Sequence, residues 1–214
     1  LARAQGLRAK GHYTALLEAH QIYQDLLSVP SLADTAEKGY IRTGILIHLR
    51  KKELGVVTDS TLEKIENFLL GRAQSNEYLE LIDLARRISP SVKGVLGETR
   101  ADKNEMEDYL DWLRSRFPAL NEKLHLKAAS DEFYAYLYLS FVEAFSFKFQ
   151  TLPDFSAIRN SFPDSNLLKF KQAIFPKILS KDLMDILSRD PDFAEAHFFL
   201  GDQSLGEGLV LSSE

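Results

Sequence analysis

The sequence predicts an all-α protein, and three observations lead to that prediction. Leucine outnumbers valine by 34 to 7, which favours helices because β-branched side chains lose rotamer freedom there and leucine loses little. Apolar residues recur three and four positions apart along most of the chain. Glycine and proline stand mostly between these periodic stretches. With 214 residues and 45% hydrophobic content, we expect a single domain over residues 1–214 with its own core.

In the first half of the chain, each expected helix is separated from the next by a helix-breaking residue. Gly11 divides the first two helices, so that they form a helical hairpin. Ser60 followed by Glu63 resembles a capping box, which marks the start of a helix. Asn76 is expected to cap the helix after it. The predicted helices cover about residues 1–10, 12–29, 33–52, 61–70 and 76–88.

The second half begins with residues 89–101, which lack periodicity and are predicted to form a loop and a sub-boundary of the domain. A helix is then expected to end at Pro118, followed by a short one. Pro176 is expected to interrupt a longer helix near the end. The predicted helices cover about residues 102–118, 119–127, 130–149, 154–162, 166–188 and 194–205.

Residues 133–149 are unusually rich in tyrosine and phenylalanine. The first part is apolar on nearly every face, as expected of a helix buried among others, whereas residues 145–149 alternate with period two and are also compatible with an extended segment. The favoured interpretation is the centre of the core. The alternative is the wall of an apolar ligand cleft, with Tyr134 and Tyr138 one turn apart in it.

Residues 190–208 resemble the junction between two tetratricopeptide repeats, with His197 where that family usually has a large aromatic residue. Residues 1–50 carry a weaker resemblance, and residues 95–165 carry none. The resemblance implies antiparallel helical pairs stacked as a right-handed superhelix with an irregular middle section. It also implies close helix crossings at Gly44 and Gly201. The matching residues of the C-terminal stretch are Pro191, Ala194, Ala196, His197, Leu200, Gly201 and Gly208.

Composition and motifs argue against several functional classes. A net charge of -5 without a basic cluster argues against nucleic acid as the main partner, and no apolar run is long enough to span a membrane. The chain has no cysteine, and its five histidines are scattered. The charges between Lys103 and Arg116 alternate in sign, which is typical of a solvated helix face. We therefore predict no enzymatic activity, no cofactor and no metal.

The resemblance leaves binding as the expected function, with a protein or peptide in a concave groove. A small-molecule binding protein is the alternative, similar in general character to bacterial envelope lipoproteins associated with periplasmic solute transport, with an apolar ligand near residues 130–150. An enzyme is the third hypothesis, with Glu122 and His125 as its first candidates. The sequence opens at Leu1 inside a helical pattern, so we expect a trimmed or processed form, and cytoplasm and periplasm are both compatible. The residues predicted to contact the partner are Lys38, Arg42, His48, Phe198 and Asp202.

Overall fold

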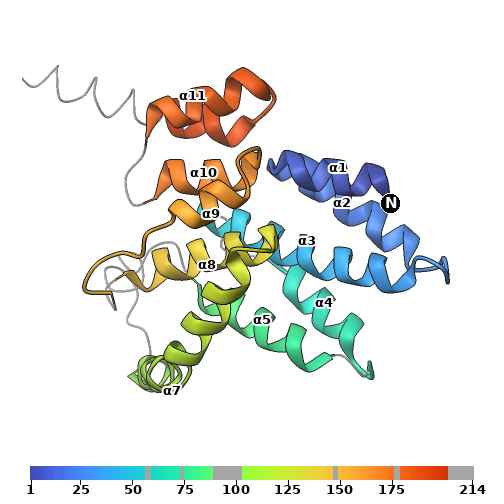
Figure 1. The fold of residues 1–214 in the computed structure, drawn as a ribbon. Coiled ribbons are helices and arrows are strands. Elements are labelled where there is room, and N and C mark those ends of the chain that lie inside the picture. The colour runs from blue at the N-terminus through green and yellow to red at the C-terminus, as the bar shows by residue number, and fades with distance from the viewer. Residues whose placement is uncertain (56–58, 73–74, 89–102, 147–148, 176–178, 202–214) are drawn as a thin grey trace, which may run out of the picture. The chain divides into compact units, whose positions relative to one another are not determined.

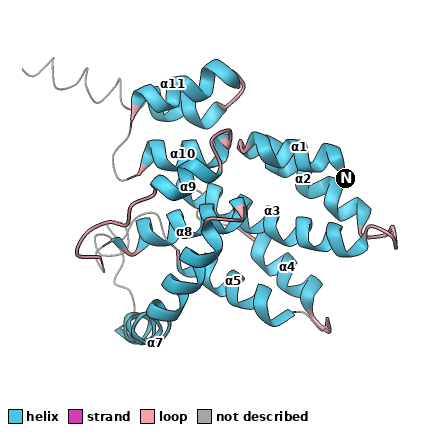
Figure 2. Ribbon diagram, viewed as in Figure 1, coloured by secondary structure: helices cyan, strands magenta, loops and turns pink. Residues whose placement is uncertain are grey.

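The computed structural model describes the chain outside residues 56–58, 73–74, 89–102, 147–148, 176–178 and 202–214. The described residues form helices joined by turns and loops, and none of them forms a strand (Figure 2). This confirms the all-α prediction. The sub-boundary predicted at residues 89–101, the partner residue Asp202 and the repeat position Gly208 lie outside the described residues. Residues 75 and 103–110 are described by their backbone alone.

The helices follow one another in the expected order (Figure 1). Their bounds are α1 Ala2–Lys10, α2 Tyr13–Leu26, α3 Ala33–Glu53, α4 Thr61–Leu69, α5 Ser75–Arg87, α7 Lys103–Ala128, α8 Glu132–Ala144, α9 Ser156–Ser161, α10 Asn166–Ile174 and α11 Ser180–Arg189. Residues 194–201 are also helical. Packing joins successive helices in pairs, namely α1 with α2, α4 with α5, α7 with α8 and α10 with α11.

The predicted break at Pro118 is wrong, because α7 continues through this proline to Ala128. A proline inside a helix costs about 3 kcal/mol through a lost hydrogen bond and a steric clash. Three leucines on both sides of Pro118, at positions 113, 120 and 124, are at most 4% exposed. They form one apolar stripe along α7, and burying each contributes about 1.5–3 kcal/mol. The free energy gained by burying the three leucines therefore exceeds the cost of keeping Pro118 inside the helix.

The capping box predicted at Ser60 is also wrong. The side chain of Ser60 makes no capping hydrogen bond at the start of α4. Instead the carboxylate of Asp59 accepts hydrogen bonds from the Thr61 N–H at 3.1 Å and the Thr61 hydroxyl at 2.5 Å. A carboxylate is the stronger acceptor, and its charge is stabilised at a helix N-terminus. Asp59 therefore caps the start of α4 in place of Ser60, the residue that the sequence pattern indicates.

The chain divides into two compact units, residues 1–47 with 162–214 and residues 48–161. The first unit contains a cluster of buried side chains from α10, α11 and the segment after it, listed here as Phe170, Ala173, Leu183, Ile186, Phe193 and Ala196. In the second unit every residue of α8 from Phe133 to Val142 is at most 5% exposed. The aromatic helix is therefore central to the core of its unit.

Gly39 shows where two helices of the first unit come close together. A Cβ added to Gly39 of α3 would collide with the ring of Tyr23 on α2. Gly44, at which the repeat resemblance implies a close crossing, is buried, and that crossing stays a prediction. Gly201 is exposed and a Cβ there would meet no atom within 4 Å, so the crossing predicted at Gly201 is wrong for the described residues. Its helix packs through Ala196 and Phe199, which leaves Gly201 on the outer side.

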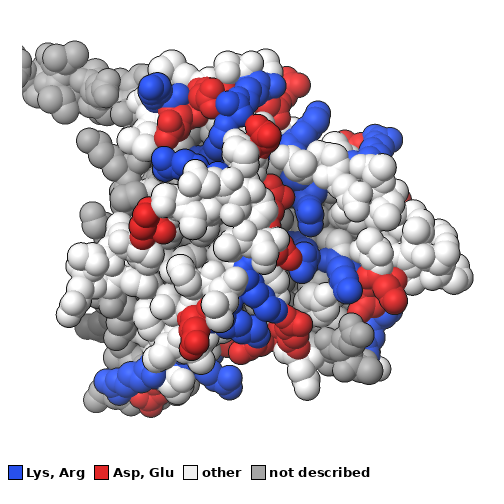
Figure 3. All heavy atoms as spheres, in the orientation of Figure 1, with Lys and Arg blue, Asp and Glu red and all other residues white. Residues whose placement is uncertain are grey.

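The described helices carry charge on their surfaces and contain no candidate for a membrane span. None of them combines enough length with enough apolar character to cross a lipid bilayer. On the face drawn in Figure 3, the lysine and arginine side chains of the described residues are interspersed with aspartate and glutamate. Such mixed charge gives that face no extended field of one sign.

Candidate functional site

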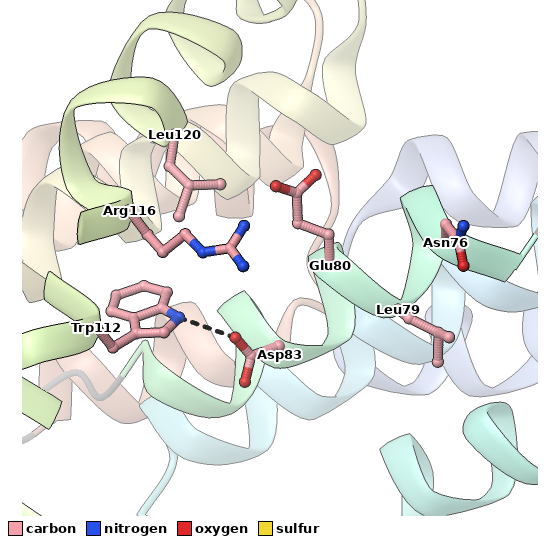
Figure 4. Close-up of a pocket in the computed structure, with 7 residues that line it drawn as sticks. All are labelled: Asn76, Leu79, Glu80, Asp83, Trp112, Arg116 and Leu120. Atoms are coloured by element: carbon pink, nitrogen blue, oxygen red, sulfur yellow. Dashed lines mark hydrogen bonds between the residues drawn. The ribbon is translucent and has the colours of Figure 1, made fainter. Parts of the chain in front are cut away.

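A cleft of about 400 Å³ lies between α5 and α7, inside the second unit. It is open to solvent rather than enclosed, and Figure 4 shows its side chains. Two helices supply the lining at intervals of three or four residues, as expected when each contributes one face. The lining residues are Asn76, Leu79, Glu80 and Asp83 of α5, and Trp112, Arg116 and Leu120 of α7.

One end of the cleft is held by Asp83, Arg87 and Trp112. The carboxylate of Asp83 accepts a hydrogen bond of 2.9 Å from the indole N–H of Trp112. The same carboxylate accepts from the Arg87 guanidinium at 3.1 and 3.3 Å, and that guanidinium lies over the Trp112 ring, 4.8 Å from its centroid. These three contacts hold the indole in place against α5. The Trp112 ring thereby becomes a fixed, partly exposed wall.

Further along the same two helices, lysines of α7 pair with glutamates of α5. Lys123 bonds Glu80, and Lys127 bonds Glu77 at 2.7 Å. The hydroxyl of Tyr134 donates to the same oxygen of Glu77 at 2.8 Å, which adds α8 to the contact. Because Lys127 and Tyr134 both bond its charged form, the pKa of Glu77 is lowered. The Glu77 bond likewise raises the pKa of Lys127.

Arg116 occupies the middle of the cleft. Its guanidinium extends into the space between Trp112 and Leu120, on the side that faces Glu80 and Asp83 (Figure 4). Those two carboxylates are bonded to Lys123 and Arg87. Arg116 is exposed, and among the described residues no hydrogen bond, ion pair or ring contact engages it. Its five N–H donors therefore face solvent in the cleft.

The cleft as a whole can bind a group that is partly apolar and carries one negative charge. The charged residues of the lining are Glu80, Asp83 and Arg116. Lys123 and Arg87, which lie outside the lining, bond the two carboxylates, so Arg116 carries the one lining charge that no described residue pairs. The lining also offers apolar surface, from the Trp112 ring and from Leu79, which is 38% exposed. Water is excluded poorly in an open cleft, so the geometry favours binding over chemistry that needs a dry site.

A second polar cluster joins the end of α3 to the start of α4. The imidazole Nδ1 of His48 bonds the Asp59 carboxylate at 2.7 Å, and Lys51 donates to the other Asp59 oxygen at 2.7 Å. Burial lowers the pKa of His48, and its hydrogen bond to Asp59 only partly offsets that. Four hydrogen bonds, two of them from Thr61, hold the pKa of Asp59 well below its usual range in spite of burial. This cluster fastens the two helices together, and the buried Nε2 of His48 is left without a hydrogen bond from the described residues.

A third cluster lies deep in the core of the same unit. Tyr136 is 0% exposed, and its hydroxyl donates to the Glu53 carboxylate at 2.7 Å. Arg50, 1% exposed, donates to the other oxygen of that carboxylate at 3.0 Å. Burial raises the pKa of Tyr136 far above its ordinary value, and the charge of Glu53 adds to that effect. The cluster offers no access for a ligand, and it links α3 to α8.

The residues predicted to contact a partner are found in different surroundings. Lys38 is exposed, Arg42 is partly buried, and Phe198 is 59% exposed, all in the first unit. His48 belongs to the second unit and is only 7% exposed. It is bonded to Asp59, so its side chain is not presented at a surface. The fifth predicted residue, Asp202, is not described.

Tyr134 and Tyr138, predicted for an apolar ligand cleft, are 5% and 2% exposed. Tyr134 is bonded to Glu77, and the Tyr138 ring packs edge-on against His125 and Phe155. The cleft described above is lined by other residues. Of the two candidates for an enzyme, Glu122 and His125 are both exposed, and the described residues place no carboxylate in hydrogen-bond contact with that imidazole.

Sequence reasoning missed Trp112 and Arg116 as site residues. Arg116 was part of a run of alternating charges, which is typical of a solvated face, and that interpretation holds for the neighbouring pair Arg114 and Asp111. The available signal was the single tryptophan of the chain, one helical turn from an arginine. Among the described residues, no three histidine, aspartate or glutamate side chains lie close enough together to hold a metal ion.

Comparison of the chain with protein-family models, with curated proteins and with solved structures finds no match. The likeness to tetratricopeptide repeats therefore rests on the quoted residues alone. What the structure establishes is the helical class and the packing of neighbouring helices in pairs.

Proposed function

We propose that this chain is a non-catalytic binding module that holds a protein or peptide partner in the cleft between α5 and α7. One observation carries the proposal. The charges of the cleft walls are paired with one another, whereas Arg116 extends into the open space with its donors unused by the described residues. A buried or fully paired arginine would fit a structural role. An unused guanidinium in a cleft that also offers a partly exposed indole and an exposed leucine fits a contact with another molecule.

The shape of the cleft supports a macromolecular partner over a small molecule. Sites for small ligands usually enclose most of the ligand surface in a largely apolar cavity. This cleft stays open on one side, and charged groups make up much of its lining. Arginine and tryptophan are also the residue types that dominate the energetics of protein interfaces.

The same proposal includes the architecture that the repeat resemblance implies, a right-handed stack of helical pairs with a concave surface. The pairing of α1 with α2, α4 with α5, α7 with α8 and α10 with α11 supports it. Within that architecture Lys38, Arg42 and Phe198 remain predicted contacts of a second partner surface, and charge reversal at Arg42 is its test. Small-angle scattering of the whole chain tests the stack, because a curved array scatters as an elongated particle.

Partner capture with cleft variants tests the function. Proteins retained by the immobilised wild-type chain are compared with those retained by Leu79→Lys, which places a charge on the exposed apolar wall of the cleft. The matched control is Leu126→Lys on α7, because Leu126 is 68% exposed and does not line the cleft. We expect the control to retain the wild-type partners and Leu79→Lys to lose them. Equal retention by both variants contradicts the proposal.

A further inference from the structure

We infer that the segment bound in the α5–α7 cleft is an amphipathic helix of the partner that places one carboxylate between two large apolar side chains. This inference rests on the proposed function and adds the chemistry of the partner. It follows from three properties of the cleft, which are its single unused charge, the spacing of its contact residues on α7 and the helical nature of both walls.

The charge of the cleft selects a carboxylate. Arg116 carries the one charge of the lining that no described residue pairs, and its planar guanidinium matches a carboxylate with two parallel hydrogen bonds. A phosphate would carry a charge close to −2 at neutral pH. Its second negative charge would find no second unpaired cation in the lining, because the carboxylates of Glu80 and Asp83 already engage Lys123 and Arg87. A single aspartate or glutamate therefore fits better.

The order of side chains on α7 selects the flanking apolar groups. Trp112, Arg116 and Leu120 succeed one another at intervals of four residues, which is about 6 Å along the helix axis. Figure 4 shows the guanidinium between the indole and the leucine. A partner helix with an acidic residue opposite Arg116 and an apolar residue four positions away, opposite Trp112, matches this spacing. A second apolar residue, four positions to the other side, reaches the edge of Leu120, which is 4% exposed.

The walls of the cleft favour a helical partner over an extended one. Both walls are α-helices, whose backbone N–H and C=O groups bond within the helix. An extended segment would find no sheet edge here to satisfy its own backbone groups. In a helical partner the backbone N–H and C=O groups already bond one another. Such a partner contacts the cleft through side chains alone, which is the helix-in-groove mode of recognition.

Selection from a peptide library tests the inference with the intact chain. A displayed library of random peptides of about 15 residues, the length at which isolated helices become stable enough to form, is selected on the wild-type protein. We expect the enriched peptides to share an acidic residue with large apolar residues three or four positions to either side. They should gain helical circular dichroism on binding. Enriched peptides without the acidic residue, or no enrichment at all, overturn the inference.

Charge exchange then tests the role of Arg116. We expect Arg116→Glu to lower the affinity for an enriched peptide by about tenfold or more. A peptide with lysine in place of its acidic residue should regain affinity for that variant. Arg114→Glu is the matched control, because Arg114 lies on the same helix, is exposed and pairs with Asp111 outside the cleft. Equal weakening by Arg114→Glu overturns the inference.

The outcomes separate this inference from the function on which it rests. One outcome is a set of peptides that bind Leu79→Lys more weakly than the wild type but bind Arg116→Glu equally well. That result would support the cleft as the binding site and refute the proposed contact between Arg116 and a carboxylate of the partner. Peptides insensitive to both variants refute the cleft itself. Competition by phenyl phosphate that is stronger than competition by benzoate identifies a phosphate ligand and also overturns the inference.

Discussion

The backbone N–H of Tyr13 donates a hydrogen bond of 2.6 Å to the carboxylate of Glu195, across 182 residues of sequence. Tyr13 is the first residue of α2, and Glu195 belongs to the helical residues 194–201. The N-cap residue His12 satisfies a second N–H of the same turn, because its Nδ1 accepts from Ala15 at 3.1 Å. One end of α2 is thus capped partly by its own sequence and partly by the far end of the chain.

Replacing Glu195 with alanine should destabilise the first unit. Glu195 is 4% exposed, and its loss leaves the Tyr13 N–H at the start of α2 without its acceptor. We expect a fall of about 1–2 kcal/mol in the free energy of unfolding, as for other lost N-caps. Urea denaturation followed by circular dichroism measures it. Glu195→Gln keeps an acceptor oxygen and should lose less, and an equal loss in both variants would show that the negative charge matters instead.

The close approach of α2 and α3 gives a second prediction. Gly39→Ala places a methyl group against the Tyr23 ring, which is 3% exposed and has little room to move. Overpacking of this kind costs about 1–3 kcal/mol, more than the gain of at most about 1 kcal/mol from better helix propensity. Gly6→Ala is the matched control, because Gly6 also lies within a helix and a Cβ there meets nothing within 4 Å.

We therefore expect thermal unfolding to show opposite shifts, with Gly39→Ala lower than the wild type and Gly6→Ala higher. A Gly39→Ala protein as stable as the wild type would mean that α2 and α3 are further apart than described.

Much of the fold could be predicted from local sequence, because helix ends depend on few residues. Gly11 ends α1 in the left-handed conformation with φ 77°, as its position between two periodic stretches indicated. Pro118 shows the limit of such reasoning, because the packing of α7 against its neighbours decides whether a proline ends a helix. The cap of α4 by Asp59 instead of Ser60 was a choice between adjacent residues that the pattern could not make.

The candidate site could not be predicted in the same way, because it depends on which helix faces lie opposite each other. Arg116 and Arg114 look alike in sequence, both within a run of alternating charge. Only the position of α5 opposite α7 distinguishes them, since it places Arg116 in the cleft and leaves Arg114 paired with Asp111. Spacing within one helix carries no information about its neighbour.

Lys52 makes the stability of the second unit depend on pH. Its ammonium donates to the backbone carbonyls of Ala85, Arg86 and Ile88 at 3.3, 2.6 and 2.9 Å, at the end of α5. Burial lowers the pKa of Lys52 from 10.5 to about 8. Between these two values the unfolded chain binds more protons than the folded chain at this residue, so stability should rise with pH.

Urea denaturation at several pH values from about 7.5 to 9.5 measures this dependence and stays below the range where the tyrosines ionise. We expect the wild-type free energy of unfolding to rise across that window. Lys52→Met, which cannot titrate, should be less stable because the three carbonyls lose their donor, and its stability should change less with pH. Identical slopes for both proteins would show that Lys52 keeps its ordinary pKa.

The buried hydrogen bond between Tyr136 and Glu53 should contribute more to the free energy of unfolding than a tyrosine hydroxyl without such a bond. Removing the hydroxyl in Tyr136→Phe leaves the Glu53 carboxylate, whose side chain is 4% exposed, with one donor fewer. The desolvated charge then lacks compensation, and we expect a loss of about 1–3 kcal/mol in the free energy of unfolding. The matched control is Tyr138→Phe, two residues along the same helix, where the ring is 2% exposed and the described residues supply no hydrogen bond to the hydroxyl.

The control should change stability by less than about 0.5 kcal/mol, because it removes a hydroxyl to which the described residues make no hydrogen bond. If both variants lose the same amount, the cost comes from removing a hydroxyl anywhere in the core and not from the Glu53 contact. A double variant, Tyr136→Phe with Glu53→Gln, sharpens the comparison. It removes the carboxylate charge together with its donor but takes the counter-charge from the buried Arg50, so it should lose more stability than Tyr136→Phe alone.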